Sequence, residues 1–188
     1  MIREVGVALP YWLDRPEEEA VEIAVAAEQA AFEMVWVGEM ASFDAFALAT
    51  AIGLKTERVR LRIGPLAVGV RSPVGIALGV ASVATLIGRG ALGSSSPAIV
   101  SGWHDRSWTA LAPRMREAVP ALRAILDGKR ADIAGEHMRA HGFKLRRPQP
   151  DASITVAAHG PAMTRVAARL ADEVVLNLVD ARPCTRRP

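Results

Sequence analysis

Short apolar runs alternate with amphipathic segments along most of the chain. Each run is bounded by Gly, Pro or charged residues, which is typical of buried strands. The segments between them have apolar positions three and four residues apart, which predicts helices. We expect strands at 5–9, 34–37, 58–68, 90–93, 154–158 and 174–178, and helices at about 17–32, 45–54, 73–86, 114–126 and 161–170.

Local signals support several of these boundaries. Asp14 and Pro16, followed by three glutamates, predict the start of the first helix. Ser42 or Asp44 can cap the second helix, and Pro73 can open the third. Residues 132–144 do not follow the strand–helix alternation. They contain a glycine between two β-compatible pieces, which predicts a surface hairpin.

Strands without polar alternation, separated by helices, indicate a parallel sheet covered by helices. The pattern contains about six βα units. Two α/β architectures fit that number: an open doubly wound sheet, and a TIM-type (β/α)8 barrel that stops early. The pattern alone does not separate them.

Composition fits one globular domain. Of the 188 residues, 51% are hydrophobic and 23% are charged. The formal net charge is +3, and most of the excess lies in the last residues, which include Arg182, Arg186 and Arg187. Because no basic stripe with interleaved aromatic residues is present, we expect no nucleic-acid partner.

Cysteine content and hydropathy restrict the expected cellular compartment and the kinds of site that the chain can form. The single cysteine, Cys184, excludes a disulfide framework within the chain and a cysteine-based metal site. No apolar run reaches the length of a bilayer span, and the residues after Met1 do not resemble a signal peptide. We therefore expect a cytoplasmic protein without a membrane partner.

Ligands of parallel α/β folds bind at the carboxyl ends of strands, so polar residues there are the main candidates. Glu39 follows the second expected strand, and its alternative role is to cap the next helix. Gly64 and Pro65 interrupt the third strand and predict a bend.

Two further stretches could hold a phosphate. Ser94, Ser95 and Ser96 follow the fourth expected strand, where hydroxyl and backbone N–H groups could bind an anion or could form only a turn. His159, Gly160 and Pro161 open a helix after the fifth buried strand, and the glycine allows close approach of the backbone.

Histidines give weaker signals. His104 lies between a tryptophan and an aspartate, and could be a proton carrier or a packed loop residue. His137 and His141 flank the expected hairpin, so we expect no metal site there. No Walker loop, zinc spacing, nucleophile elbow or dinucleotide fingerprint is present. From the residues alone, the prediction is a phosphate-bearing ligand above a parallel sheet.

Several short motifs, in order, resemble the bacterial luciferase-like monooxygenase family and its flavin- or deazaflavin-dependent oxidoreductases. The resemblance extends over about residues 5–179, and one branch of the family has a similar Ser-Ser-Pro and Gly-Trp-His pattern. The motifs lie at residues 27–32 (AEQAAF), 35–39 (VWVGE), 56–61 (TERVRL), 71–73 (RSP), 154–161 (ITVAAHGP), 95–97 (SSP) and 102–104 (GWH).

The resemblance implies a TIM-type barrel with coenzyme F420, or alternatively FMN, at the carboxyl ends of the strands. It implies a cis peptide in a bulge of the third strand, behind the cofactor ring, where Gly64 and Pro65 stand. It implies hydride transfer between the cofactor and a small organic substrate, with Glu39 and His104 as catalytic residues. Ser94–Ser96 and His159–Pro161 would bind the cofactor.

The chain departs from the family pattern in two ways. Many deazaflavin enzymes have a histidine after the acid of the second strand, where this chain has Met40, so His104 or water would carry the proton. The pattern also stops after six units, whereas such a barrel has eight and typically ~250 residues. We therefore expect an incomplete, C-terminally truncated barrel domain at 1–179 and an irregular Arg/Pro tail at 180–188.

Incompleteness leaves two functional hypotheses open. The chain is a luciferase-like oxidoreductase if the missing strands are supplied, or an inactive remnant or binding module of the same family. Its open side predicts self-association or a homodimer. An open Rossmann-type NAD(P) protein is disfavoured because the glycine fingerprint is absent.

Overall fold

The computed structural model describes residues 5–9, 16, 18–39, 43–96, 104 and 109–176. Helices and strands alternate along the chain as expected, apart from one hairpin. The helices are α1 (Glu19–Gln29), α2 (Ala45–Gly53), α3 (Pro73–Ile87), α4 (Leu111–Leu126) and α5 (Gly160–Leu170). The strands are β1 (Gly6–Ala8), β2 (Met34–Val37), β3 (Arg60–Ala67), β4 (Ala91–Ser96), β5 (Ala131–Ala134), β6 (Arg139–Phe143), β7 (Ile154–Ala157) and β8 (Glu173–Val175).

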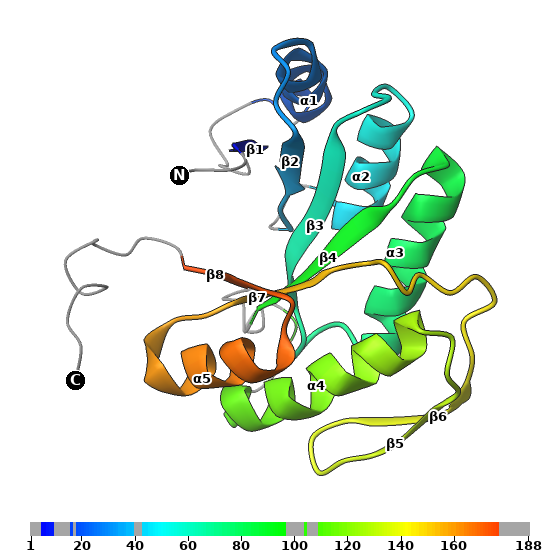
Figure 1. Cartoon of the computed structure of the whole chain (residues 1–188), viewed down its shortest axis with the longest axis vertical. Coiled ribbons are helices and arrows are strands. Elements are labelled where there is room, and N and C mark those ends of the chain that lie inside the picture. Colours follow the sequence, from blue (N-terminus) through cyan, green and yellow to red (C-terminus); the bar gives the residue numbers. More distant parts are fainter. Residues whose placement is uncertain are drawn as a thin grey trace.

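Six strands form one sheet in the order β1-β2-β3-β4-β7-β8, and every neighbouring pair is parallel. The prediction of a parallel α/β sheet is therefore confirmed. Within the described residues the sheet is open, with β1 and β8 as its two edges and no closed barrel (Figure 1).

The helices cover one side of the sheet, and each of α1, α2, α3 and α4 contacts the next helix along the chain. The core lies between the helices and the strand residues that point toward them. Its largest fully buried side chains include Ile52 of α2, Leu61 and Ile63 of β3, Ile76 of α3 and Ile154 of β7. The other side of the sheet carries several polar side chains.

Side chains that accept backbone hydrogen bonds start two of the helices. Asp44 caps α2 by accepting hydrogen bonds from the backbone N–H groups of Phe46 and Ala47 at 2.9 and 3.1 Å. Ser72 caps α3, with Pro73 in its first turn. Two of the expected cap residues, Asp14 and Ser42, lie outside the described residues.

Two strands differ from expectation. β1 was expected to be buried, but Gly6 and Ala8 are exposed because, among the described strands, β1 lies at the sheet edge with β2 as its single neighbour. β4 was expected to end at Gly93, but it continues to Ser96 because Ser95 and Ser96 pair with Leu66 and Ala67 of β3.

The interruption of β3 is a true irregularity of the sheet. The register between β3 and β4 shifts between Ile63 and Leu66, and the peptide bond between Gly64 and Pro65 is cis. Gly64 has a φ of 133°. The cis bulge that the resemblance implied at Gly64 and Pro65 is confirmed.

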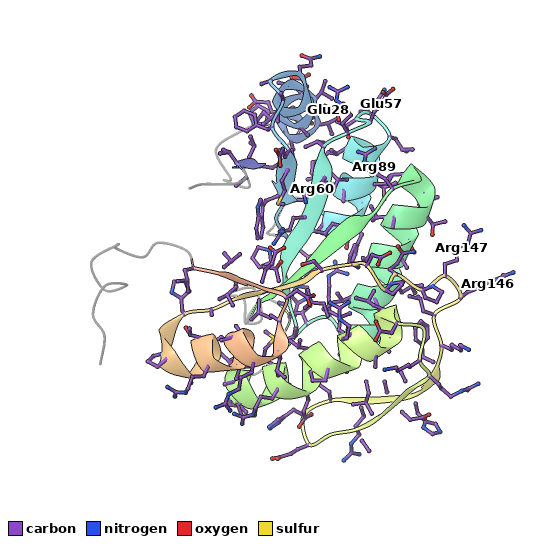
Figure 2. The ribbon with its side chains drawn as sticks, in the orientation of Figure 1. Glu28, Glu57, Arg60, Arg89, Arg146 and Arg147 are labelled. Atoms are coloured by element: carbon purple, nitrogen blue, oxygen red, sulfur yellow. The ribbon has the colours of Figure 1, made fainter. Side chains whose placement is uncertain are left out.

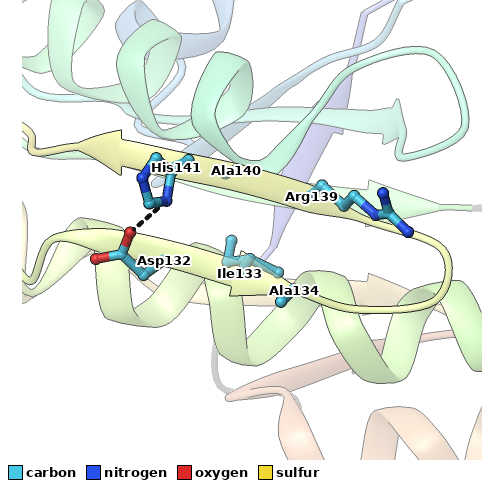
Figure 3. A pocket seen from close by; sticks show the side chains of 6 residues that line it. All are labelled: Asp132, Ile133, Ala134, Arg139, Ala140 and His141. Carbon is cyan, nitrogen blue, oxygen red and sulfur yellow. Dashed lines mark ion pairs between the residues drawn. The ribbon is translucent and has the colours of Figure 1, made fainter.

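The hairpin expected within 132–144 is also confirmed. β5 and β6 pair antiparallel and form a separate two-stranded sheet. Glu117 of α4 holds the turn, because its carboxylate accepts backbone hydrogen bonds from Glu136, His137 and Met138 at 3.0–3.2 Å. Figure 3 shows the outer part of this hairpin, with the ion pair between Asp132 and His141.

Two of the sequence motifs meet at the start of β3. The carboxylate of Glu28, in α1, accepts hydrogen bonds from the backbone N–H groups of Glu57, Arg58 and Val59 at 2.6–3.0 Å. These bonds lower the pKa of Glu28 to about 2, although burial works in the opposite direction. Figure 2 shows Glu28 and Glu57 at the end of the sheet opposite the strand ends where ligands were expected.

Candidate functional site

Four of the expected ligand-binding stretches lie at one edge of the sheet. Because the strands are parallel, their carboxyl ends meet at the same edge. Glu39 follows β2, Gly64 and Pro65 lie within β3, Ser94–Ser96 end β4, and His159 follows β7. We call this row the carboxyl edge. The strands β2, β3, β4 and β7 are consecutive in the sheet, so the row is continuous.

Glu39 lies in an ion-pair network. Arg71 donates from Nε to Glu39 Oε2 at 2.9 Å, and its Nη2 pairs with both Glu39 Oε1 and Asp44. The side chain of Glu39 is 13% exposed and that of Arg71 is 25% exposed, so the pair is largely shielded. The guanidinium of Arg71 also lies over the ring of Phe46, 5.0 Å from its centroid.

The network shifts the pKa values of Arg71 and Asp44. The hydrogen bond to Glu39 raises the pKa of Arg71, opposed by burial. For Asp44, burial would raise the pKa, but the hydrogen bonds from Arg71 and from the helix backbone lower it below its usual range. Two carboxylates share one guanidinium, so this part of the carboxyl edge carries one net negative charge. The sequence reasoning missed Arg71, whose only visible signal was its place in the RSP motif.

The centre of the carboxyl edge consists of small residues and backbone. Pro65 is partly exposed and Gly64 is buried. Ser95 lies between Leu66 of β3 and Val156 of β7 in the sheet. Ser94–Ser96 therefore belong to the strand itself, rather than to a loop after it as expected.

The first turn of α5, after β7, is the last part of the carboxyl edge. His159 is extended, with φ of −123° and ψ of 133°, and Gly160 has φ of +75°. No side chain in the part of the chain that the structure describes caps the helix, so backbone N–H groups of its first turn lack a side-chain partner there. A Cβ on Gly160 would meet no atom of the described residues within 4 Å, so a ligand could approach this turn closely. Helix starts of this kind favour anions.

His104 cannot be assigned to the carboxyl edge. It is exposed, and the residues on both sides of it, 101–103 and 105–108, lie outside the described residues. Its catalytic role stays a prediction. His141 pairs with Asp132 at 2.8 Å on the hairpin. Among the described residues, no group of three or more His, Cys, Asp or Glu side chains could hold a metal ion.

The polar side of the sheet holds a second group that sequence reasoning missed. Arg62 of β3 is only 3% exposed and donates hydrogen bonds to Thr155 of β7 and Glu173 of β8. Its guanidinium carbon lies 4.8 Å from the ring centroid of Trp36, in β2. The sequence did contain one signal for this group, namely an arginine within an otherwise apolar strand.

Surface hollows occur elsewhere on the molecule. One lies on the β5–β6 hairpin and includes Asp132, Arg139 and His141 in its lining (Figure 3). Another lies between α3 and the segment after the hairpin, where Figure 2 labels Arg146 and Arg147. Their linings do not include the residues of the carboxyl edge.

The residues of the carboxyl edge fit a flat cofactor with an anionic tail. Backbone and a proline ring at Gly64 and Pro65 offer a surface without a long side chain, against which a ring can lie. Two strands away, after β7, the first turn of α5 offers N–H groups and space above Gly160 for a phosphate.

A parallel βα sheet with a bulged third strand and an anion-favouring helix start belongs to the class of α/β folds that bind ligands at the carboxyl ends of their strands. The family model described as "Luciferase-like monooxygenase" matches residues 7–185, and the chain belongs to this family.

Known proteins are similar to this chain in sequence or in fold. A 5,10-methylenetetrahydromethanopterin reductase of Archaeoglobus fulgidus is 31% identical over 161 residues, which are 80% of this chain and 46% of that protein. The solved coenzyme F420-dependent tetrahydromethanopterin reductase of Methanopyrus kandleri superposes with a TM-score of 0.81 at 18% identity, over 93% of this chain and 55% of that one. The solved oxygenating constituent of 3,6-diketocamphane monooxygenase of Pseudomonas putida, in complex with FMN, superposes with a TM-score of 0.72 at 16% identity. The match covers 90% of this chain and 56% of that one.

This chain spans about half the length of the curated relatives it matches. Its solved neighbours are TIM-barrel enzymes, and the six strands described here correspond to part of such a barrel. In the part of the chain that the structure describes, no helix is both long and apolar enough to cross a membrane.

Proposed function

We propose that this chain is an oxidoreductase that binds coenzyme F420, with FMN as the alternative, and takes part in hydride transfer to or from a small organic substrate. Membership of the luciferase-like family supports the class of reaction. A solved neighbour that depends on F420 and another in complex with FMN support this pair of cofactors.

The observation that carries the proposal is the continuity of the carboxyl edge. It places the β3 bulge at Gly64 and Pro65 between the Glu39 network on one side and the uncapped first turn of α5 on the other. The cofactor ring would lie against the bulge. Its phosphate would bind near Ser94–Ser96 and His159–Pro161.

The bound cofactor would supply the redox chemistry, and the chain would bind and orient it. Glu39, held by Arg71, would present a fixed carboxylate to the ring or its polar side chain. Because Glu39 stays paired, we propose that His104 or water, rather than Glu39, moves the proton. The functional domain is proposed to be residues 1–179, with homodimer formation or self-association through the open side of the sheet.

Titration of the purified chain with F420 and with FMN tests the proposal, followed by cofactor absorbance and fluorescence. We expect saturable binding of at least one cofactor. No binding of either at high micromolar concentration would refute the proposal for this chain.

Two glycine variants make the test specific to the site. Gly160 and Gly142 both have positive φ, at +75° and +74°, but Gly142 lies on the hairpin. Alanine at either position costs similar backbone energy. We expect only Gly160→Ala to weaken cofactor binding, by about tenfold, which corresponds to about 1.4 kcal/mol. Equal weakening in both variants would argue against a phosphate site at α5.

A second candidate is an inactive remnant that keeps the binding edge without turnover. The open sheet favours this alternative, because both edge strands lack one neighbour among the described residues. Cofactor binding without hydride exchange, measured against a panel of alcohols and sugar phosphates, would support it.

A further inference from the structure

Arg62 connects strands that are distant in the sequence. From β3 it reaches across β4 and donates from Nη1 to Thr155 in β7 and to Glu173 in β8. On the other side, its guanidinium lies over the ring of Trp36, in β2. A single side chain therefore contacts residues of three strands besides its own.

The contacts are shielded from water on the arginine side. The side chain of Arg62 is 4% exposed, whereas that of Glu173 is 46% exposed. Nε of Arg62 is buried without a hydrogen-bond partner among the described atoms, so the guanidinium is held by its Nη1 contacts and by the ring of Trp36. A buried guanidinium that loses its partners is costly, which fixes the strands around it.

The two acceptors lie on the strands that precede and follow α5. Thr155 lies in β7, which leads into His159 and Gly160 at the start of α5. Glu173 begins β8, directly after α5 ends at Leu170. Glu173 is further held by Ser153, which donates a hydrogen bond to Oε1 at 3.3 Å. Arg62 thus ties the β7–α5–β8 unit to β3.

Arg62 also lies close to the bulge. It is two residues before Gly64, about 7 Å along the strand. Arg62 therefore belongs to β3, the strand that would support the cofactor ring, and also contacts the β7–α5–β8 unit, which would bind the cofactor phosphate. Misplacement by about 1 Å of one binding element relative to another is enough to weaken a site strongly.

We infer that Arg62 is a positioning residue: through Thr155 and Glu173 it sets the distance between the β3 bulge and the first turn of α5, so that ring and phosphate of one cofactor are bound together. This inference rests on the proposed function, since it concerns the same cofactor. Arg62 itself touches neither proposed contact region.

The test compares Arg62→Met with Arg60→Met. Arg60 lies on the same strand two residues earlier, is about half exposed and pairs with Glu33 at 3.5 Å, so its variant controls for the loss of a strand arginine. For each protein, dissociation constants are measured for FMN and riboflavin, which differ only in the phosphate. The same is done for F420 and its deazaflavin core without the phosphate-bearing tail.

The measured quantity is the ratio of the dissociation constant of the phosphate-free ligand to that of the phosphate-bearing ligand. For Arg62→Met we expect this ratio to fall about tenfold, while the dissociation constant of the phosphate-free ring changes little. Arg60→Met should keep the wild-type ratio. Glu173→Gln, which keeps a hydrogen-bond acceptor, should have a ratio of dissociation constants close to that of wild type. An unchanged ratio in Arg62→Met, or an equal loss for both ligands, would overturn the inference.

Hydrogen exchange gives a readout that needs no cofactor. We expect the backbone amides of β8 to exchange about tenfold faster in Arg62→Met than in Arg60→Met, because the tie to β3 is lost. If Arg62→Met does not fold by circular dichroism, Arg62→Lys and Glu173→Ala, which removes the acceptor in β8, replace it. If wild type binds no cofactor, the proposed function fails, and unchanged β8 exchange would separately show that Arg62 does not hold this unit.

Discussion

Replacement of Glu28 by glutamine should destabilise the protein at neutral pH and have less effect in acid. In the folded state the carboxylate accepts hydrogen bonds from Glu57, Arg58 and Val59, and its pKa falls from 4.5 to about 2. That difference corresponds to at most about 3 kcal/mol of stability. The side chain is partly exposed, so solvent screening reduces the value, and we expect about 2 kcal/mol for Glu28→Gln at pH 7.

The pH dependence follows from the lowered pKa. A carboxylate whose folded pKa lies below its unfolded pKa stabilises the fold above the unfolded value, and this stability is lost as pH falls through the folded value. The contribution of Glu28 should therefore be complete above about pH 5 and decline between about pH 4.5 and 2. Less than half of it should remain at about pH 3.

Urea denaturation of wild type and Glu28→Gln at several pH values between 7 and 3 measures the effect. Glu22→Gln is the matched control, since Glu22 is an exposed acid of the same helix. Its free energy of unfolding should stay within about 0.5 kcal/mol of wild type. A difference between wild type and Glu28→Gln that is absent at pH 7, or constant down to pH 3, would refute the reasoning.

Three further changes probe caps and packing. Asp44→Ala should lower the free energy of unfolding by about 1–2 kcal/mol through loss of the α2 cap, seen in urea denaturation, and Asp44→Asn should recover most of it. Gly79→Ala should lower the melting temperature, because its Cβ would lie 2.4 Å from the ring of Phe46, whereas Gly75→Ala on the same helix should not. Glu117→Ala should speed proteolysis within the hairpin turn without affecting the sheet, and equal cleavage of wild type would contradict this.

Elements determined by local sequence were predicted well. β2 has the predicted bounds, because a short apolar run between polar residues has only one buried-strand interpretation. Asp44 and Ser72–Pro73 start helices where their side chains can accept backbone hydrogen bonds. The β3 bulge was predicted from Gly64 and Pro65 through the family resemblance, and not from hydrophobic pattern.

Features that depend on distant partners were not predicted. β1 is apolar, yet it is exposed, because edge position depends on which strands are present beside it. Arg62 and Glu173 are 111 residues apart, so no local pattern could pair them. Sequence reasoning identified Glu39 as a carboxylate at a strand end. It could not show that Arg71 would pair with this carboxylate through hydrogen bonds.

The strand order has a consequence for how the chain folds. Each of β1, β2 and β3 pairs with the next strand along the chain, so the part from β1 to β4 can assemble progressively from the N-terminus. β7 joins β4 only after α4 and the hairpin have been made, which is the longest connection in the sheet. We therefore expect the β1–β4 half to form first during synthesis, and α5 with its proposed phosphate site to complete only when β7 and β8 dock.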